Sequence, residues 1–352
     1  MRPELSLPRR RVAWRERVPE AWRTPLLQLT LAWCGIALLT RGDWLEMARQ
    51  WWNSSTCNHI LLIPPILAWL VRLRWPELAK LRPQAWWPGL AWLGGGLLAS
   101  GLGTAASINL LAQLGAVVLL QAAVAVWLGP RIVAGLLVPL AYMAFRLPVG
   151  DEIGPPLQQI TARMAVALTQ ASGVSSSIAG VFIDTPVGRF EVAEACSGVK
   201  FLIAMIALGT LVAHLCFRNW KRRAAFMAAC AVVPVLANGV RAWGTIYIAQ
   251  SRGVEFAAGF DHIVYGWFFF ALVMTAVLAV SWRFFDRAAN DRLVDADALD
   301  ASPVLDRLAR YRIGGWRALA LLLLARLLVA LWGVALAHPL ADSFLAATGL
   351  RP

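Results

Sequence analysis

Charged residues are scarce in this sequence. They make up 15% of its 352 residues, whereas apolar residues make up 59%. A soluble domain carries about a quarter charged residues, so a single soluble globular domain is excluded. The excess of apolar side chains fits several spans of about 20 residues each. We therefore predict an all-α polytopic membrane protein.

Acidic residues are also few relative to basic ones. The chain has 33 Lys and Arg against 20 Asp and Glu, which gives a net charge of +13. In a soluble protein this charge would suggest a nucleic-acid partner. Here the basic residues gather in short loops between apolar runs, a pattern typical of membrane topology and of contact with anionic lipids. We expect membrane lipids as partners and no nucleic acid.

The sequence has five cysteines but lacks any closely spaced pair of them. A disulfide framework is therefore not indicated. Cys57 and His59 are expected on the same side of the membrane as Cys196 and His262, and such thiolate and imidazole groups suit zinc. No close-spaced ligand motif supports a zinc site, and we expect no metal and no cofactor.

Apolar runs of span length recur along the chain. Two Pro residues, Pro64 and Pro65, are expected to kink the second span or make it re-entrant. The ninth run is the weakest, so we predict about eight or nine transmembrane helices. The runs cover residues 25–40, 59–73, 86–106, 108–128, 131–148, 197–216, 224–249, 262–282 and 316–336.

The more polar stretch 149–195 is expected to form an amphipathic helix at the membrane interface, "PPLQQITARMAVALTQ", followed by a β-hairpin, "GVFIDTPVGRFEVAEA". Pro-Val-Gly lies near the predicted turn of that hairpin. This segment connects the fifth and sixth spans, so it lies entirely on one side of the membrane.

Arginines orient the chain, because cytoplasmic loops carry an excess of Lys and Arg. They are concentrated before the first span and after the second, fourth, sixth and eighth spans. The N-terminus is therefore expected in the cytoplasm and segment 149–195 on the outer side. The predicted organisation is a basic cytoplasmic tail 1–24, a transmembrane domain 25–282, a charged cytoplasmic segment 283–315, and a further span with a short outer tail 316–352.

This orientation brings three reactive side chains to one depth. Cys196 enters the sixth span, Arg241 lies in the outer part of the seventh, and His262 begins the eighth. A thiolate can act as a nucleophile, an imidazole as a general base, and a guanidinium as an oxyanion stabiliser. A charge within a span is costly and usually functional. The residues alone also allow a structural cysteine, a snorkelling arginine and a capping histidine.

Four separated motifs resemble the exosortase/archaeosortase family, in order, over about residues 45–282. The resemblance maps the family's nucleophile to Cys196, its arginine to Arg241, its histidine to His262, and an N-terminal histidine to His59. The subtype it resembles most is exosortase A, which is associated with exopolysaccharide production in Gram-negative bacteria. The motifs read "NHILLIPPILAWL", "EACSGVKFLIAMIALGTL", "VLANGVRAWGTIYIA" and "GFDHIVYGWFFF".

The resemblance implies a membrane-embedded cysteine protease or transpeptidase of the bacterial inner membrane. Its partners would be PEP-CTERM-type proteins, which carry a Pro-Glu-Pro motif, one transmembrane helix and a basic tail. Cys196 would form the acyl-enzyme at the periplasmic face, Arg241 would stabilise the oxyanion, and His262 would act as general base and then acid. Residues expected to bind substrate or support the site are His59, Glu194, Ser197, Lys200, Asn238, Asp261 and Tyr265.

Two of these supporting roles are more specific. Asn238 and Asp261 are expected to orient Arg241 and His262. Lys200 stands where related sequences often carry arginine, which retains the charge but not bidentate anion binding. The alternative function is a non-enzymatic transport or assembly component of exopolysaccharide export. In that case the outer Arg and His would contact anionic sugars, and Cys196 would be dispensable.

Overall fold

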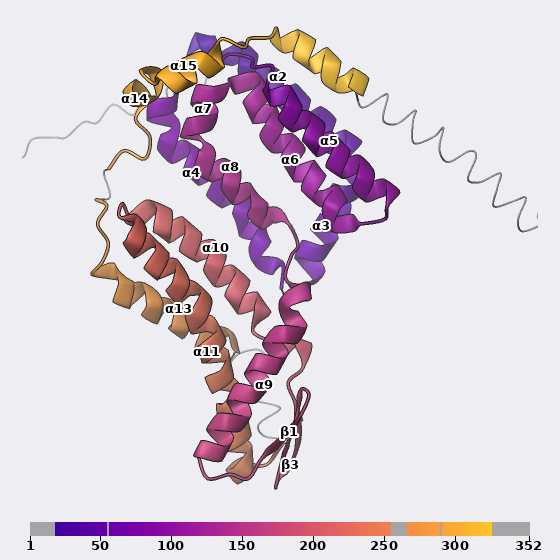
Figure 1. Cartoon of the computed structure of the whole chain (residues 1–352), viewed down its shortest axis with the longest axis vertical. Helices are drawn as coiled ribbons and strands as arrows, with labels where there is room; N and C mark the ends of the chain where they lie inside the picture. The colour runs from indigo at the N-terminus through magenta and orange to yellow at the C-terminus, as the bar shows by residue number, and fades with distance from the viewer. Residues whose placement is uncertain (1–17, 55, 255–265, 289–290, 326–352) are drawn as a thin grey trace, which may run out of the picture. The chain divides into compact units, whose positions relative to one another are not determined.

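The computed structural model describes residues 18–54, 56–254, 266–288 and 291–325. The described chain is mostly α-helical, with one small sheet, and it divides into two units (Figure 1). The first unit takes its described residues from Met1–Ala48, Ile63–Leu147 and Arg292–Pro352. The second takes them from Arg49–Leu62 and Pro148–Asp291.

The first unit is built around one helix that is buried along most of its length, α6. Most of its side chains are small or apolar, and Trp127 near its end is fully buried. Helices α2 and α5 pack against α6, and Trp33 of α2 donates a hydrogen bond to the Leu120 carbonyl of α6 (3.0 Å). The helices of this part of the chain are α2 (Glu20–Leu39), α3 (Arg41–Asn53), α4 (Ile63–Leu78), α5 (Gly89–Ala105) and α6 (Asn109–Leu128).

Glycines allow α5 and α6 to pack backbone against backbone. A Cβ atom at Gly115 would lie 2.3 Å from the Ser100 nitrogen, and one at Gly103 would lie 2.2 Å from the Ala112 nitrogen. Small residues of this kind drive close helix packing in membranes. The Gly-rich helix α5 therefore packs closely against α6.

Substituting Gly115 by valine is expected to lower the free energy of unfolding by about 1–3 kcal/mol, because the obstructing atoms belong to the backbone and cannot rotate away. Gly94 of α5 is the matched control, since a Cβ atom there meets nothing within 4 Å. Thermal unfolding in detergent would compare Gly115→Val with Gly94→Val. Equal midpoints for the two variants would contradict the close packing.

The predicted fifth span is not one continuous helix. Residues 131–148 contain three short helical pieces, α7 (Pro130–Gly135), α8 (Leu137–Tyr142) and η2 (Met143–Arg146). Pro139 has no N–H group to bond the Gly135 carbonyl, which interrupts the ladder between α7 and α8. Gly135 also packs closely against Leu78, since a Cβ atom at position 135 would lie 2.6 Å from the Leu78 side chain.

Within the described residues, three helices are long and apolar enough to cross a membrane: α6, α10 (Val199–Cys216) and α11 (Trp220–Arg252). A fourth is added if α3 and the helix that follows it form one broken span. Shorter apolar helices cover Leu137–Arg146, Phe268–Trp282 and Gly315–Ala325. The count of eight or nine spans therefore stays a prediction.

The second unit combines helices with a small sheet. Helix α11 packs against α9 (Gly154–Ala171), α10 and α13 (Gly266–Trp282) (Figure 1). The sheet has three antiparallel strands in the order β1 (Ser177–Ala179), β2 (Phe182–Thr185) and β3 (Gly188–Glu191). Pro186 and Val187 join β2 to β3, so the segment predicted as a hairpin supplies two of three strands.

Helix α9 covers the stretch predicted as an interfacial amphipathic helix. Its buried face carries Leu157, Thr161, Ala165 and Thr169. That face packs on α11, where a Cβ atom at Gly239 would lie 2.6 Å from the Met164 side chain. The amphipathic pattern of α9 therefore corresponds to packing within the second unit.

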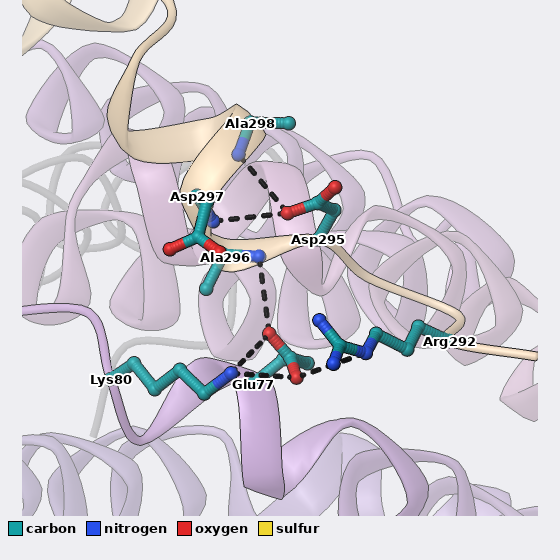
Figure 2. Close-up of polar contacts among 7 residues, drawn as sticks. All are labelled: Glu77, Lys80, Arg292, Asp295, Ala296, Asp297 and Ala298. Carbon is teal, nitrogen blue, oxygen red and sulfur yellow. Dashed lines mark hydrogen bonds and ion pairs between the residues drawn. The ribbon is translucent and has the colours of Figure 1, made fainter.

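The charged segment after α13 is fixed at both of its ends. In the first unit, Glu77 accepts hydrogen bonds from Lys80 (2.8 Å) and from the Ala296 N–H (3.4 Å), and Arg292 approaches it at 3.7 Å (Figure 2). Asp295 caps α14 (Ala296–Asp300). Beyond it, α15 (Pro303–Ala309) brings Asp306 to Arg131, which also pairs with Asp300 (3.3 Å).

In the second unit, Asp286 joins the end of α13 to the loop before α11. Its carboxylate accepts hydrogen bonds from the N–H groups of Arg218 and Asn219, and it lies 3.6 Å from the Arg222 guanidinium. The Arg218 N–H, followed by the Asn219 N–H and Arg222, lowers the pKa of Asp286. The charged form is therefore favoured in the folded protein.

A lowered pKa gives stability that is present above the ordinary Asp pKa and lost as the pH falls through the folded value. We expect Asp286→Asn to lower the melting temperature in detergent at pH 7, and we expect this difference to shrink as the pH falls below the ordinary Asp pKa of about 4. Asp184→Asn is the control, because its pair with Arg189 is exposed at both ends. An equal melting temperature for wild type and Asp286→Asn at pH 7 would exclude the contribution.

Candidate active site

Cys196 lies on a tight turn between the sheet and helix α10. It ends the short helix η4 (Glu194–Cys196), where its N–H donates to the Ala193 carbonyl (2.8 Å). Two residues later Gly198 takes a φ of 84° and is the N-cap residue of α10. Such a φ suits glycine, which has no Cβ to clash with the backbone. The side chain of Cys196 is half-buried, whereas Ser197 is buried.

The amide of Asn238 holds this turn from the middle of α11. Its Nδ2 donates to the Cys196 carbonyl oxygen (2.9 Å) and to the Thr161 hydroxyl of α9 (3.0 Å). Asn238 is 3% exposed, so these hydrogen bonds form away from water. The expected role of Asn238 in orienting Arg241 stays a prediction, while its Nδ2 donates to the turn at Cys196 and to α9.

Arg241 follows Asn238 by three residues, so the two share one face of α11. Arg241 is buried, and Gly266 at the start of α13 lies against it, with 3.5 Å between a Cβ position there and the guanidinium. Both Asn238 and Arg241 line a pocket between α10, α11 and α13. Its other walls are apolar, from Phe201, Pro234, Ala237, Phe269, Phe270 and Val273.

Lys200 connects the two predicted catalytic residues that the structure describes. It lies in the first turn of α10, close enough to Cys196 and Arg241 to interact with both electrostatically. A cation near this turn would stabilise an oxyanion that develops there. Lys200 therefore lies between Cys196 and Arg241 in the network of charges at the site.

The other predicted residues are distributed more widely. His59 lies in η1 (Asn58–Leu62), where its Nδ1 contacts the Thr56 carbonyl (2.9 Å). Thr56 and Val199 both lie beside Gly150, which brings this segment near the start of α10. Glu194 is exposed on η4. His262, Asp261 and Tyr265 lie outside the described residues.

Three residues at the site were not predicted from the sequence. Gln158 of α9 donates to the Val192 carbonyl (2.9 Å) just before the turn, and Thr161 meets Asn238. Gly198 lies so close to Asn238 that a Cβ atom would be 2.8 Å from its Cγ. The sequence did contain one signal for Gln158 and Thr161. They are polar residues three positions apart on a predicted helix, and Thr161 lies on its apolar face.

Metal-binding residues do not cluster in the part of the chain that the structure describes. No group of three His, Cys, Asp or Glu side chains there is arranged to hold an ion. The described site thus offers one thiol, two cationic side chains and a buried amide.

A comparison with protein families identifies one match. The model of a family described as transmembrane exosortase matches residues 51–279, which is more than half of the chain. The matched range includes Cys196, Lys200, Asn238 and Arg241. No curated protein and no solved structure matches the sequence.

Proposed function

Because this chain belongs to the transmembrane exosortase family, we propose that it is a membrane-embedded cysteine protease or transpeptidase. Its substrates are exported proteins with a C-terminal PEP-type sorting signal, and its activity is linked to exopolysaccharide production. The observation that carries the proposal is the turn at Cys196. It lies close to Lys200, and its main-chain carbonyl is bonded to Asn238, which shares a face of α11 with Arg241.

The chemistry follows from these side chains. The Cys196 thiolate attacks a backbone carbonyl carbon near the sorting motif, and the new S–C bond gives a tetrahedral oxyanion. Arg241 stabilises this oxyanion, and its effect is large because the residue is buried. The C–N bond then breaks, and His262, which took the thiol proton, returns it to the leaving amine. Water or an acceptor amine finally displaces Cys196 from the acyl-enzyme.

The membrane supplies the geometry for substrate delivery. The asymmetry of arginines favours a cytoplasmic N-terminus and a site at the periplasmic face of the bacterial inner membrane. A substrate helix can approach laterally through the lipid and present the residues before it at the outer interface. Its basic tail then remains in the cytoplasm, in agreement with the same charge rule.

The first test is substrate processing. A reporter protein with a Pro-Glu-Pro motif, one transmembrane helix and a basic tail is co-expressed with the enzyme. Cys196→Ala and Cys196→Ser are expected to leave the reporter at full length on a gel, since neither side chain supplies a thiolate. Both variants should accumulate in membranes as the wild type does.

Cys34→Ala is the matched control, because Cys34 is a free cysteine in the other unit. It is expected to process the reporter normally. Normal processing by Cys196→Ser would overturn the proposed function.

The second test separates an enzyme from a transport or assembly component. Two forms of the protein keep a single cysteine, either Cys196 or Cys57, and are treated with a small thiol-alkylating reagent. We expect Cys196 to react faster, because it is half-buried and flanked by Lys200, whereas Cys57 is buried. The pH dependence of the Cys196 reaction should change in His262→Ala. Equal rates and an unchanged profile would favour the transport component.

A further inference from the structure

Asn238 joins three separate segments of the second unit. Its Nδ2 group reaches the Cys196 carbonyl (2.9 Å) on the turn and the Thr161 hydroxyl (3.0 Å) on α9, while its own backbone belongs to α11. A carbonyl oxygen only accepts hydrogen bonds, so the Cys196 contact determines which end of the amide is the nitrogen. Both bonds thus depend on the same NH2 group.

One atom of this amide lowers the stability of the folded protein. Asn238 is 3% exposed, and its Oδ1 atom is buried without a hydrogen-bond partner among the described residues. A buried polar atom without a partner costs stability, and the two hydrogen bonds of the amide nitrogen must offset that cost. The amide is therefore better explained by what its nitrogen holds in place.

The turn is shaped to meet this amide. Gly198 approaches so closely that a Cβ atom would lie 2.8 Å from the Asn238 Cγ, and its φ of 84° belongs to the left-handed region. On the other side of Cys196, Gln158 holds the Val192 carbonyl (2.9 Å). Side chains from α9 and α11 thus fix the chain before and at Cys196.

The tether also relates Cys196 to Arg241. Asn238 and Arg241 lie three residues apart on one rigid helix, and both line the same pocket. The hydrogen bond from Asn238 to the Cys196 carbonyl therefore fixes the position of Cys196 relative to α11, the helix that carries Arg241. Loss of this bond would let the turn move relative to Arg241.

We propose that Asn238 is a positioning residue, which sets the place of the Cys196 nucleophile by holding its main-chain carbonyl, while Thr161 orients the amide and Gly198 makes room for it. This inference rests on the proposed function, because it concerns the same acyl transfer. It assigns to Asn238 no contact with the reacting atoms.

The test measures processing of the same reporter protein by purified full-length enzyme in detergent. Asn238→Leu keeps the approximate shape of the side chain and removes both hydrogen bonds. We expect its kcat to fall on the order of 100-fold, because a small displacement of a catalytic group has an effect of that size. KM and the pH profile should stay unchanged, since the tether touches neither the substrate nor the thiol.

Thr161 provides a matched pair of variants. Thr161→Ser keeps the hydroxyl that accepts from Asn238 and is expected to retain wild-type kcat. Thr161→Val keeps the shape without that acceptor and is expected to lose about 10-fold in kcat. If Asn238→Leu fails to accumulate in membranes, this pair decides the question, because valine and serine are both close in size to threonine.

The outcomes distinguish the two levels of the argument. Normal processing by Cys196→Ser overturns the proposed function, and with it the reaction that Asn238 would serve. An inactive Cys196→Ser together with equal kcat in Thr161→Val, Thr161→Ser and wild type overturns the positioning role alone. A fall in kcat confined to Asn238→Leu and Thr161→Val, with KM unchanged, supports it.

Discussion

The hydrogen bonds of one buried amide organise the candidate site. Helices within an apolar unit can pack in many registers, but a buried polar group is satisfied only where a partner meets it. In the second unit, the Asn238 amide meets the Cys196 carbonyl and the Thr161 hydroxyl. These contacts fix the positions of α9, α11 and the turn relative to one another. The turn directly follows the small sheet in the chain.

Cys196 lies on a turn, and side chains from two helices restrain that turn. A turn alone presents Cys196 with little restraint, whereas a nucleophile must keep its position to within a fraction of an ångström. Gln158 of α9 and Asn238 of α11 each hold a main-chain carbonyl of this segment. The helix packing at Gly239 and Met164 then keeps the two supports together.

The sequence predicted elements better than the contacts between them. The apolar runs located α6 and α10 closely, because residues with apolar side chains continue for the length of each helix. The interruption at Pro139 was missed, because a single proline leaves the run apolar enough to count as a span. Cys196 and Arg241 stood out as costly or reactive groups in a membrane. Thr161 did not, because its partner Asn238 lies 77 residues away in the chain.

The sequence has 18 tryptophans, and several of them serve as hydrogen-bond donors inside the first unit. Irregular chain that leaves a helix has carbonyl groups without helical partners, and each needs a donor. A tryptophan supplies one N–H on a large apolar body, so it can bury its ring and still satisfy such a carbonyl. In the first unit, Trp22 donates to Leu81, Trp86 to Leu308 and Trp127 to Gly315. Two of these acceptors, Leu308 and Gly315, belong to the segment that follows α14. The indole N–H groups of Trp86 and Trp127 therefore hold this segment in place.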